Sequence, residues 1–316
     1  MKLTIGSRGS KLALWQAHWV SDQLAAAGYE MEVRIIKTTG DKLQAVAPGE
    51  PLPASMAQTV AEAGSKGLFI KEIEEALLAR EIDVAVHSLK DLPTEQPAGL
   101  ALAAVPQRED ARDVFISRSG QAVESLPPGA RVATSSLRRQ TQLRALRPDL
   151  AYVAMRGNLD TRLRKLERGD CEALVLAAAG VRRLGLTERI TRYFGLDQMC
   201  PAVGQGALGI EIRADDLRAH EAVARLNHPA THQAVRAERA VLRRLGGGCQ
   251  VPIAAHAVVE DGQLRLQGLV ANLGGTQIIR ARMKGLASDP EALGAAVAAD
   301  LLRQGAAQIL DELGKT

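Results

Sequence analysis

Cysteine, aromatic residues and long apolar runs are all scarce in this chain of 316 residues. Its three cysteines, Cys171, Cys200 and Cys249, lie far apart and are odd in number. This pattern argues against a disulfide framework, and no CxxC pair or Cys/His spacing indicates zinc. The sequence therefore predicts no metal site.

The apolar residues form no segment suited to a membrane. The longest apolar run, residues 173–181, is far shorter than the roughly 20 residues that a membrane helix needs. The opening residues MKLTIGSRGS contain one lysine, but no apolar core and no small-residue cleavage site, so they are not a secretory signal. We therefore predict a soluble, cytoplasmic protein with no membrane partner.

Charge is nearly balanced, with a formal net charge of +4, but arginine outnumbers lysine by 30 to 10. A guanidinium group offers a planar fork of donors that matches carboxylates and phosphates. The excess is compatible with nucleic acid, with an acidic small substrate, or with a GC-rich genome. Aromatic residues make up only 3% of the chain and do not interleave with the basic ones, as stacking on bases would require. We therefore predict no nucleic-acid partner.

Three regions follow one another along the chain, and only the last differs in its pattern from the others. The first alternates strands with helices, and its strands are predicted over 3–6, 31–38 and 82–89. The second alternates in the same way, with strands over 113–117, 130–136, 151–155 and 171–181. Both predict mostly parallel sheets covered by helices. From residue 226, a helix, period-two strands and a last helix over 290–313 predict a small α+β domain. The predicted fold class is thus α/β twice, followed by α+β.

Polar residues gather where the predicted strands lead into helices, which is where open α/β sheets bind ligands. Arg138 and Arg139 fall in the first turn of a helix, where cations oppose the helix macrodipole. An anion bound at this N-terminus, with Ser135 and Ser136 as caps, would resolve the conflict. Arginines in comparable positions are Arg8, Arg156 and Arg162, with Arg183 after the last strand. Their spread suits a polycarboxylate better than a nucleotide.

Asp91 and Cys249 stand out for other reasons. Asp91 is the acid of the HSLKD turn, and it is a candidate for charge stabilisation or proton transfer, or else a cap of the turn. Cys249 follows three glycines, which let the backbone approach something closely. No His or Asp neighbours it in sequence to form a dyad. The residues alone leave a nucleophile, a covalent anchor and a structural thiol open for Cys249.

Seven motifs in a fixed order resemble the porphobilinogen deaminase (hydroxymethylbilane synthase) family: GSRGSKLALWQA, KGLFIKEIEEALL, VAVHSLKDLP, TSSLRRQTQL, RGNLDTRL, PAVGQGALGIE and GGGCQVPI. The resemblance covers nearly the whole chain. It implies three domains, of which the first two are similar to periplasmic binding proteins. Their implied bounds are 1–106 with 207–224, then 111–200, and then 228–316.

The resemblance also implies a function. Porphobilinogen molecules are deaminated and joined head to tail to give hydroxymethylbilane and ammonia, in tetrapyrrole (haem, chlorophyll or cobalamin) biosynthesis. Growth occurs on a dipyrromethane cofactor that a thioether attaches to the motif cysteine, here Cys249. Asp91 matches the catalytic aspartate, with Lys90 beside it. The positions that match cofactor-binding residues are Arg8, Ser10, Lys90, Ser136, Arg138, Arg139, Arg156, Arg162 and Arg183.

Three further expectations follow from the resemblance. The family members are monomers, so we expect a monomer. Cys171 and Cys200 match no functional position, so we expect them to be structural. The segment 41–65, rich in Ala, Pro and Gly, is longer than the family loop that covers the active site, and we predict a mobile lid there.

A carboxylate-binding protein of the same fold without catalysis is the alternative, and it predicts a dispensable Asp91.

Overall fold

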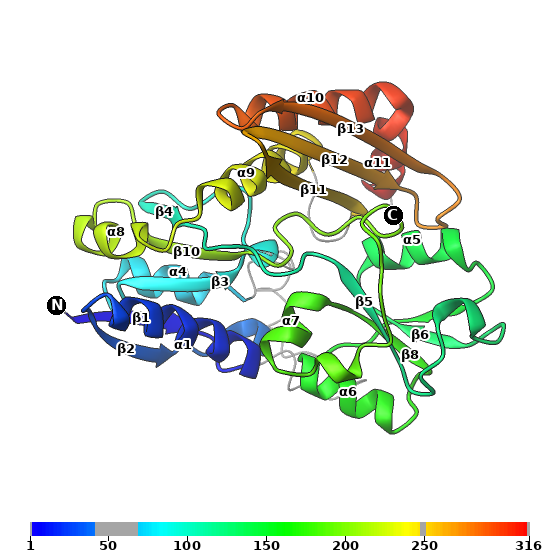
Figure 1. Cartoon of the computed structure of the whole chain (residues 1–316), viewed down its shortest axis with the longest axis horizontal. Helices are drawn as coiled ribbons and strands as arrows, with labels where there is room; N and C mark the ends of the chain where they lie inside the picture. The colour runs from blue at the N-terminus through cyan, green and yellow to red at the C-terminus, as the bar shows by residue number, and fades with distance from the viewer. Residues whose placement is uncertain (1, 42–68, 247–250, 315–316) are drawn as a thin grey trace. The chain divides into compact units, whose positions relative to one another are not determined.

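The computed structural model describes residues 2–41, 69–246 and 251–314 (Figure 1). The chain divides into two compact units, Met1–Arg108 with Ala207–His232, and Glu109–Gly206 with Gln233–Thr316. The described residues form three sheets, two of five strands and one of three, which confirms the predicted α/β class with an added α+β part. Within the described ranges, no helix has the length and apolar content needed to cross a membrane. The three-domain bounds stay a prediction.

The first unit contains a sheet with the strand order β2-β1-β3-β10-β4. Its strands are β1 (Lys2–Ser7), β2 (Glu30–Ile35), β3 (Val84–Ser88), β4 (Leu100–Ala104) and β10 (Leu208–Arg213). β1 is parallel to β2 and β3, whereas β10 is antiparallel to β3 and β4. Four of the five described strands therefore run in the same direction, which confirms the predicted mostly parallel sheet, and β10 makes the sheet mixed by running the other way. β10 enters from a distant part of the chain, so no β–α–β crossover fixes its direction.

Helices cover both faces of this sheet, as buried parallel strands require. α1 (Lys11–Ala26) and α8 (Leu217–Ala224) pack on one face, where Leu3, Ile5 and Ile210 are buried. α4 (Lys71–Leu78) packs on the other face through Ile73 and Leu77. The sheet is thereby held rigidly between two layers, and the loops at its strand ends are left to carry polar side chains.

The second unit contains a five-stranded sheet with the order β7-β6-β8-β5-β9. The strands are β5 (Asp113–Ser117), β6 (Arg131–Ala133), β7 (Ala151–Val153), β8 (Ala173–Ala177) and β9 (Arg192–Tyr193). The helices are α5 (Leu137–Leu146), α6 (Leu159–Glu167) and α7 (Ala178–Arg183). β5 runs antiparallel to β8 and β9, so this sheet is mixed as well.

The predicted strand over 171–181 is too long. It ends at Ala177, and α7 begins at the next residue. Alanine is the strongest helix former and is depleted in strands, so the run of alanines favours the change from strand to helix at this point.

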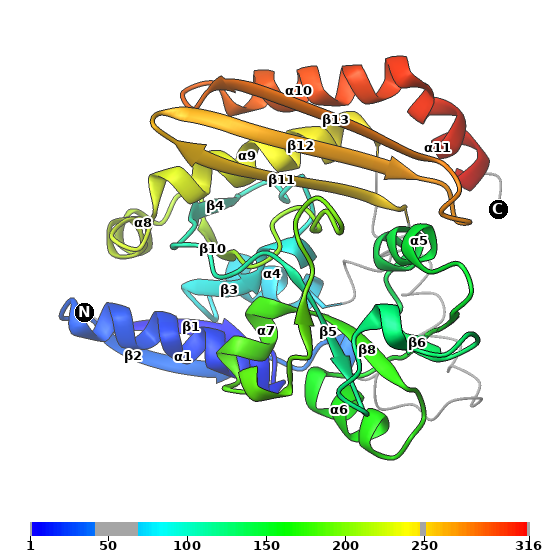
Figure 2. The ribbon, with the colours of Figure 1, turned by 45° about the vertical axis from the view of Figure 1, so that its right-hand side comes forward.

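The three-stranded sheet also belongs to the second unit. β11 (Ile253–Glu260), β12 (Gln263–Ala271) and β13 (Ile278–Leu286) pair antiparallel in sequence order, following α9 (Pro229–Arg244). One face packs on α10 (Pro290–Leu301) and α11 (Ala307–Gly314), which lie beside the sheet in Figure 2. The predicted single last helix is wrong because Gly305, with φ of 101°, breaks it.

Candidate functional site

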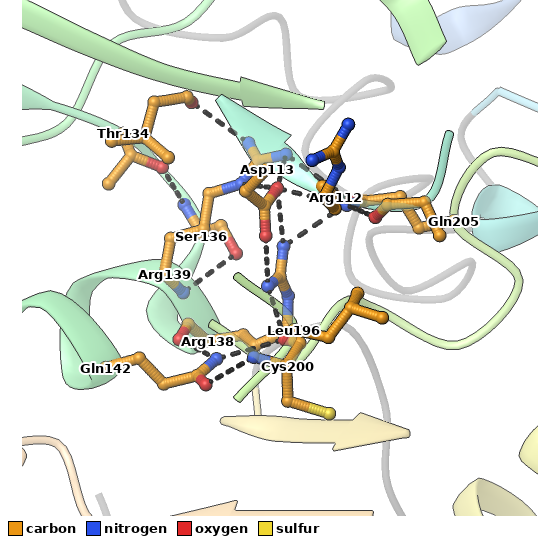
Figure 3. Close-up of polar contacts among 12 residues, drawn as sticks. Arg112, Asp113, Thr134, Ser136, Arg138, Arg139, Gln142, Leu196, Cys200 and Gln205 are labelled. Atoms are coloured by element: carbon orange, nitrogen blue, oxygen red, sulfur yellow. Dashed lines mark hydrogen bonds and ion pairs between the residues drawn. The ribbon is translucent and has the colours of Figure 1, made fainter. Parts of the chain in front are cut away.

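A buried polar cluster lies where α5 begins in the second unit (Figure 3). Ser136 is the N-cap of α5, and its hydroxyl accepts a hydrogen bond from the backbone N–H of Arg139. The side chains of Arg138 and Arg139 follow, and these residues are only 5% and 6% exposed. Both donate to the carboxylate of Asp113, the first residue of β5. The two arginines that the sequence placed at a helix N-terminus are thus together and buried.

The hydrogen bonds of this cluster use both oxygens of Asp113. Arg138 Nη1 donates to Oδ2 at 2.6 Å, and Arg139 Nε donates to Oδ1 at 2.8 Å. Gln205 Nε2 also donates to Oδ1, at 3.1 Å, and to the carbonyl of Ala111 at 2.7 Å. Arg138 Nη1 further donates to the carbonyl of Cys200 at 2.7 Å.

The electrostatics of the cluster favour the ionised form of Asp113. Burial alone would raise its pKa, but the two guanidinium groups and their hydrogen bonds outweigh burial and lower the pKa to about 2. Both buried guanidinium groups form ion pairs with this one carboxylate. The N-terminus of α5 adds a partial positive charge. The beginning of α5 is therefore suited to bind an anion.

Asp113 and Gln205 were missed as site residues by the sequence analysis. Asp113 opens the otherwise apolar strand DVFIS, and a buried carboxylate at such a place needs a cationic partner. A single acid at the start of an apolar strand is therefore the sequence signal that predicts Asp113 as a site residue. Gln205 lies between Gly204 and Gly206, whose φ angles are 71° and 86°. No pattern along the chain connects this turn to α5, since only folding brings them together.

The remaining predicted arginines of the second unit lie on two other segments. Arg183 is the last residue of α7, and its Nη2 donates to the carbonyl of Gly206 at 2.8 Å. Burial lowers the pKa of Arg183 to about 10, with Glu109 opposing the shift. Arg162 on α6 donates through Nε to the carbonyl of Gly157 at 2.8 Å. Arg156, just before α6, is exposed.

In the first unit, Arg8 and Ser10 lie between β1 and α1. Ser10 is the N-cap of α1 and accepts from the backbone N–H of Ala13 at 3.3 Å. Arg8 donates to Oδ1 of Asp41 and stacks over the ring of Phe69, 4.1 Å from its centroid. Although burial raises the pKa of Asp41, the hydrogen bonds from Arg8 and Thr38 outweigh it and lower the pKa. Arg8 is therefore held in place by a carboxylate, as Arg138 is.

Lys90 and Asp91 lie on a short 3₁₀ turn, Leu89–Asp91, that follows β3. The flanking Leu89 and Leu92 are each 1% exposed. The backbone N–H of Leu89 donates to the carbonyl of Ala207 at 3.0 Å, so the turn is fixed to the chain beside β10. Asp91 itself is exposed. The turn therefore presents an acid to solvent on a rigid base.

Two predicted features fall outside the described residues. Cys249 is one, and most of the predicted lid over 41–65 is the other. The two described cysteines, Cys171 and Cys200, are buried, and burial raises their pKa values to about 11 and 12. Such thiols are unreactive, as the structural role predicts. Among the residues that the structure describes, no group of three His, Cys, Asp or Glu side chains could hold a metal ion.

Arginines gathered at the strand ends of α/β sheets are typical of a protein that acts on small acidic molecules. Two family models specify this class. Residues 3–221 match the dipyrromethane cofactor binding domain of porphobilinogen deaminase, and residues 232–303 match the C-terminal domain of the same enzyme. The chain therefore belongs to the porphobilinogen deaminase family.

Individual relatives agree with the family models. A porphobilinogen deaminase from Pelobacter propionicus is 51% identical over 314 residues, which are 99% of this chain and 97% of the relative. Another from Desulforudis audaxviator is 52% identical over 311 residues, covering 98% and 97%. A solved structure of a putative methionine-binding lipoprotein from Bacillus subtilis is 12% identical, with a TM-score of 0.43. That match covers 72% of this chain and 90% of the lipoprotein.

The family membership confirms the resemblance and decides the activity. The chain is a transferase of the porphobilinogen deaminase family with dipyrromethane as its cofactor. Catalysis, rather than carboxylate binding alone, is therefore its function.

Proposed function

We propose that the predicted site residues divide the deaminase reaction into two tasks. The arginines of the second unit, together with Arg8, hold the carboxylates of the pyrrole chain. Asp91 stabilises the positive charge that develops when ammonia leaves and a new carbon–carbon bond forms. The observation that carries this proposal is the pair of buried arginines at the start of α5, which Asp113 holds side by side at the N-terminus of this helix.

The donor set of the second unit fits the cofactor. Each pyrrole unit carries an acetate and a propionate side chain, so the dipyrromethane group brings four carboxylates. Arg138 and Arg139 are buried and Arg183 is half-buried, and the fork of donors on a guanidinium group matches a carboxylate. A carboxylate beside Arg183 would offset the burial that lowers the pKa of this arginine to about 10. Arg156 and Arg162, with Ser10, Lys90 and Ser136 as polar helpers, complete the proposed set.

When bound, the dipyrromethane would supply the nucleophilic α-carbon for the first porphobilinogen, and the terminal pyrrole of the growing chain would supply it for each later one. Asp91 is proposed to act on the incoming substrate. As the aminomethyl carbon of porphobilinogen loses ammonia, positive charge builds on the pyrrole nitrogen, and the Asp91 carboxylate stabilises it electrostatically. The nucleophilic α-carbon would attack the methylene carbon that ammonia has left and would then lose its proton to the ammonia released, so that one C–N bond is replaced by one C–C bond. Lys90 lies beside Asp91 on the same turn and is proposed to help hold a substrate carboxylate.

Cys249 is proposed to attach the cofactor through a thioether, and the glycines before it would give the thiol room. The experiment is the intact mass of the purified protein. We expect an added mass equal to two linked pyrrole units, lost in Cys249→Ala and kept in the matched control Cys171→Ala. A chain without added mass that still converts porphobilinogen would contradict the attachment.

The carboxylate-binding role is tested by Arg138→Gln and Arg139→Gln. We expect both to lower cofactor loading or to stop chain extension, because each removes a guanidinium fork that Gln cannot replace. Arg164→Gln is the matched control, since Arg164 lies on α6 with its side chain 69% exposed. Unchanged porphobilinogen turnover in both test variants would show that these arginines do not hold the substrate chain.

The remaining features of this proposal concern the whole protein. We propose three domains with the bounds predicted from the sequence, and a soluble, cytoplasmic monomer that works without nucleic acid. Sedimentation velocity of the loaded enzyme would check the monomer, and a dimer at working concentrations would contradict it.

A further inference from the structure

Asp113 receives hydrogen bonds from two of the proposed carboxylate-binding arginines, and the proposed reaction uses neither of its oxygens. The side chain is completely buried. Arg138 approaches it with two nitrogens, Nη1 to Oδ2 at 2.6 Å and Nη2 to Oδ1 at 3.2 Å. This two-point contact fixes the plane of the guanidinium group, because both groups are flat and the fork matches the carboxylate.

Arg139 is held in a different way by the same carboxylate. Its Nε donates to Oδ1 of Asp113 at 2.8 Å, and its Nη1 donates to the carbonyl of Val175 at 3.1 Å. With Nε directed to Asp113, the side chain cannot rotate without breaking a charge-assisted bond. Figure 3 shows the two arginines approaching Asp113 from the same helix.

The same cluster extends to the backbone of Cys200. Gln142 on α5 accepts from the N–H of Cys200 at 2.7 Å and donates to its carbonyl at 3.1 Å, and Arg138 donates to that carbonyl as well. α5, β5 and the segment around Cys200 are thus joined through one connected network. In such networks the effects of single changes are not independent.

We propose that Asp113 is a positioning residue of the deaminase reaction, which sets the orientation in which Arg138 and Arg139 meet a pyrrole carboxylate. This inference rests on the proposed function, in which the two arginines hold carboxylates. Asp113 acts only through the arginines, because its own oxygens are directed at them and at Gln205.

The first test compares Asp113→Asn with Asp149→Asn. Asp149 also accepts two hydrogen bonds from one arginine, Arg147, but its side chain is 37% exposed. For folded Asp113→Asn we expect kcat/KM for porphobilinogen to fall about 10- to 100-fold, as displaced binding groups do, whereas Asp149→Asn keeps the wild-type value. Folded Asp113→Asn with wild-type kcat and KM would overturn the inference.

The second test asks whether Asp113 acts through Arg139, and it works even if Asp113→Asn does not fold. Asp113→Glu and Arg139→Lys both keep their charges but change the geometry of the contact. We expect each single variant to lower kcat/KM. In the double variant, the fold decrease in kcat/KM should be smaller than the product of the two single decreases, because residues in contact are coupled. Strictly multiplicative factors would overturn the inference, as would wild-type kcat/KM in Asp113→Glu.

The two proposals fail in different ways. Full turnover in Arg138→Gln and Arg139→Gln contradicts the proposed function. Lost turnover in those variants, with full turnover in folded Asp113→Asn, contradicts only the positioning role.

Discussion

Two aspartates of this protein adjoin strands of the two five-stranded sheets, and their surroundings are opposite. Asp91 follows β3 of the first unit and is exposed on a turn that buried leucines fix. Asp113 opens β5 of the second unit, is completely buried, and accepts hydrogen bonds from two arginines and a glutamine. Residue type alone does not distinguish them.

The difference shows how the surroundings of a carboxylate decide its use. A buried carboxylate must be paired and hydrogen-bonded, and its partners then fix its position. An exposed carboxylate on a rigid turn keeps its charge available for a bound molecule. We therefore expect the charge of Asp91 to serve catalysis and that of Asp113 to serve structure and positioning.

The largest expected effect is on turnover in Asp91→Asn. The amide has nearly the same shape but no charge, so we expect near-complete loss of hydroxymethylbilane formation with the cofactor retained. Absorbance assay of the product and intact mass would check both parts. Glu95→Gln, at an exposed acid just after the turn, is the control and should keep full activity. Normal turnover in Asp91→Asn would remove the catalytic role.

The next largest effect is on stability, in Asp113→Ala. This change leaves two buried arginines without their carboxylate, and breaking a buried ion pair costs about 3–5 kcal/mol. Urea unfolding monitored by circular dichroism would measure the loss, with Asp91→Asn as the contrasting variant of near wild-type stability. A loss below about 1 kcal/mol would mean that the cluster relaxes around the missing carboxylate.

A third acid, Glu74, adds a case between the two aspartates, because it is partly buried and lacks a strong cationic partner. Burial, together with the charge of Glu211, raises its pKa to about 7, although His87 opposes the shift. The folded pKa is above the unfolded value of 4.5. The stabilisation that the protonated Glu74 side chain contributes is therefore fully present below about pH 4.5 and is lost as the pH rises towards 7.

Glu74→Gln should remove this part of the pH dependence, worth about 1–3 kcal/mol between pH 4.5 and 7 after allowance for partial exposure. Unfolding free energies of variant and wild type across this range would measure it. Because the two proteins differ only at Glu74, the difference between the two curves reports on this side chain. Parallel curves would contradict the raised pKa of Glu74.

The pH dependence of stability that Asp113 contributes has the opposite sign. Because the pKa of Asp113 is lowered in the folded protein, stability falls only as the pH drops from about 3.8 towards 2.

The smallest effect is expected for Asp149→Asn. Its ion pair with Arg147 lies near the surface, where solvent screens the attraction, so such pairs contribute little to stability. Thermal unfolding would show a small shift at most. A loss as large as that of Asp113→Ala would mean that burial does not separate the two ion pairs.

Much of this fold follows from local sequence patterns. The sequence predicted strands at β1, β3 and β5, and Ser10 and Ser136 do cap the helices that follow them. These features depend on neighbours within a few residues, so they are encoded locally. The ordered motifs also identified the family and its cofactor, since chemistry at a shared site constrains several short segments at once.

The sequence by itself determined the strand and helix segments, the arginines at helix starts and the family. Tertiary structure decided the direction of β10, which pairs with strands over one hundred residues away, and the ends of β8 and the last helix. It also decided that Arg138 and Arg139 share Asp113, which lies 25 and 26 positions earlier. Periodicity reports which side chains are buried but not which buried groups meet, because pairing depends on how separate segments pack.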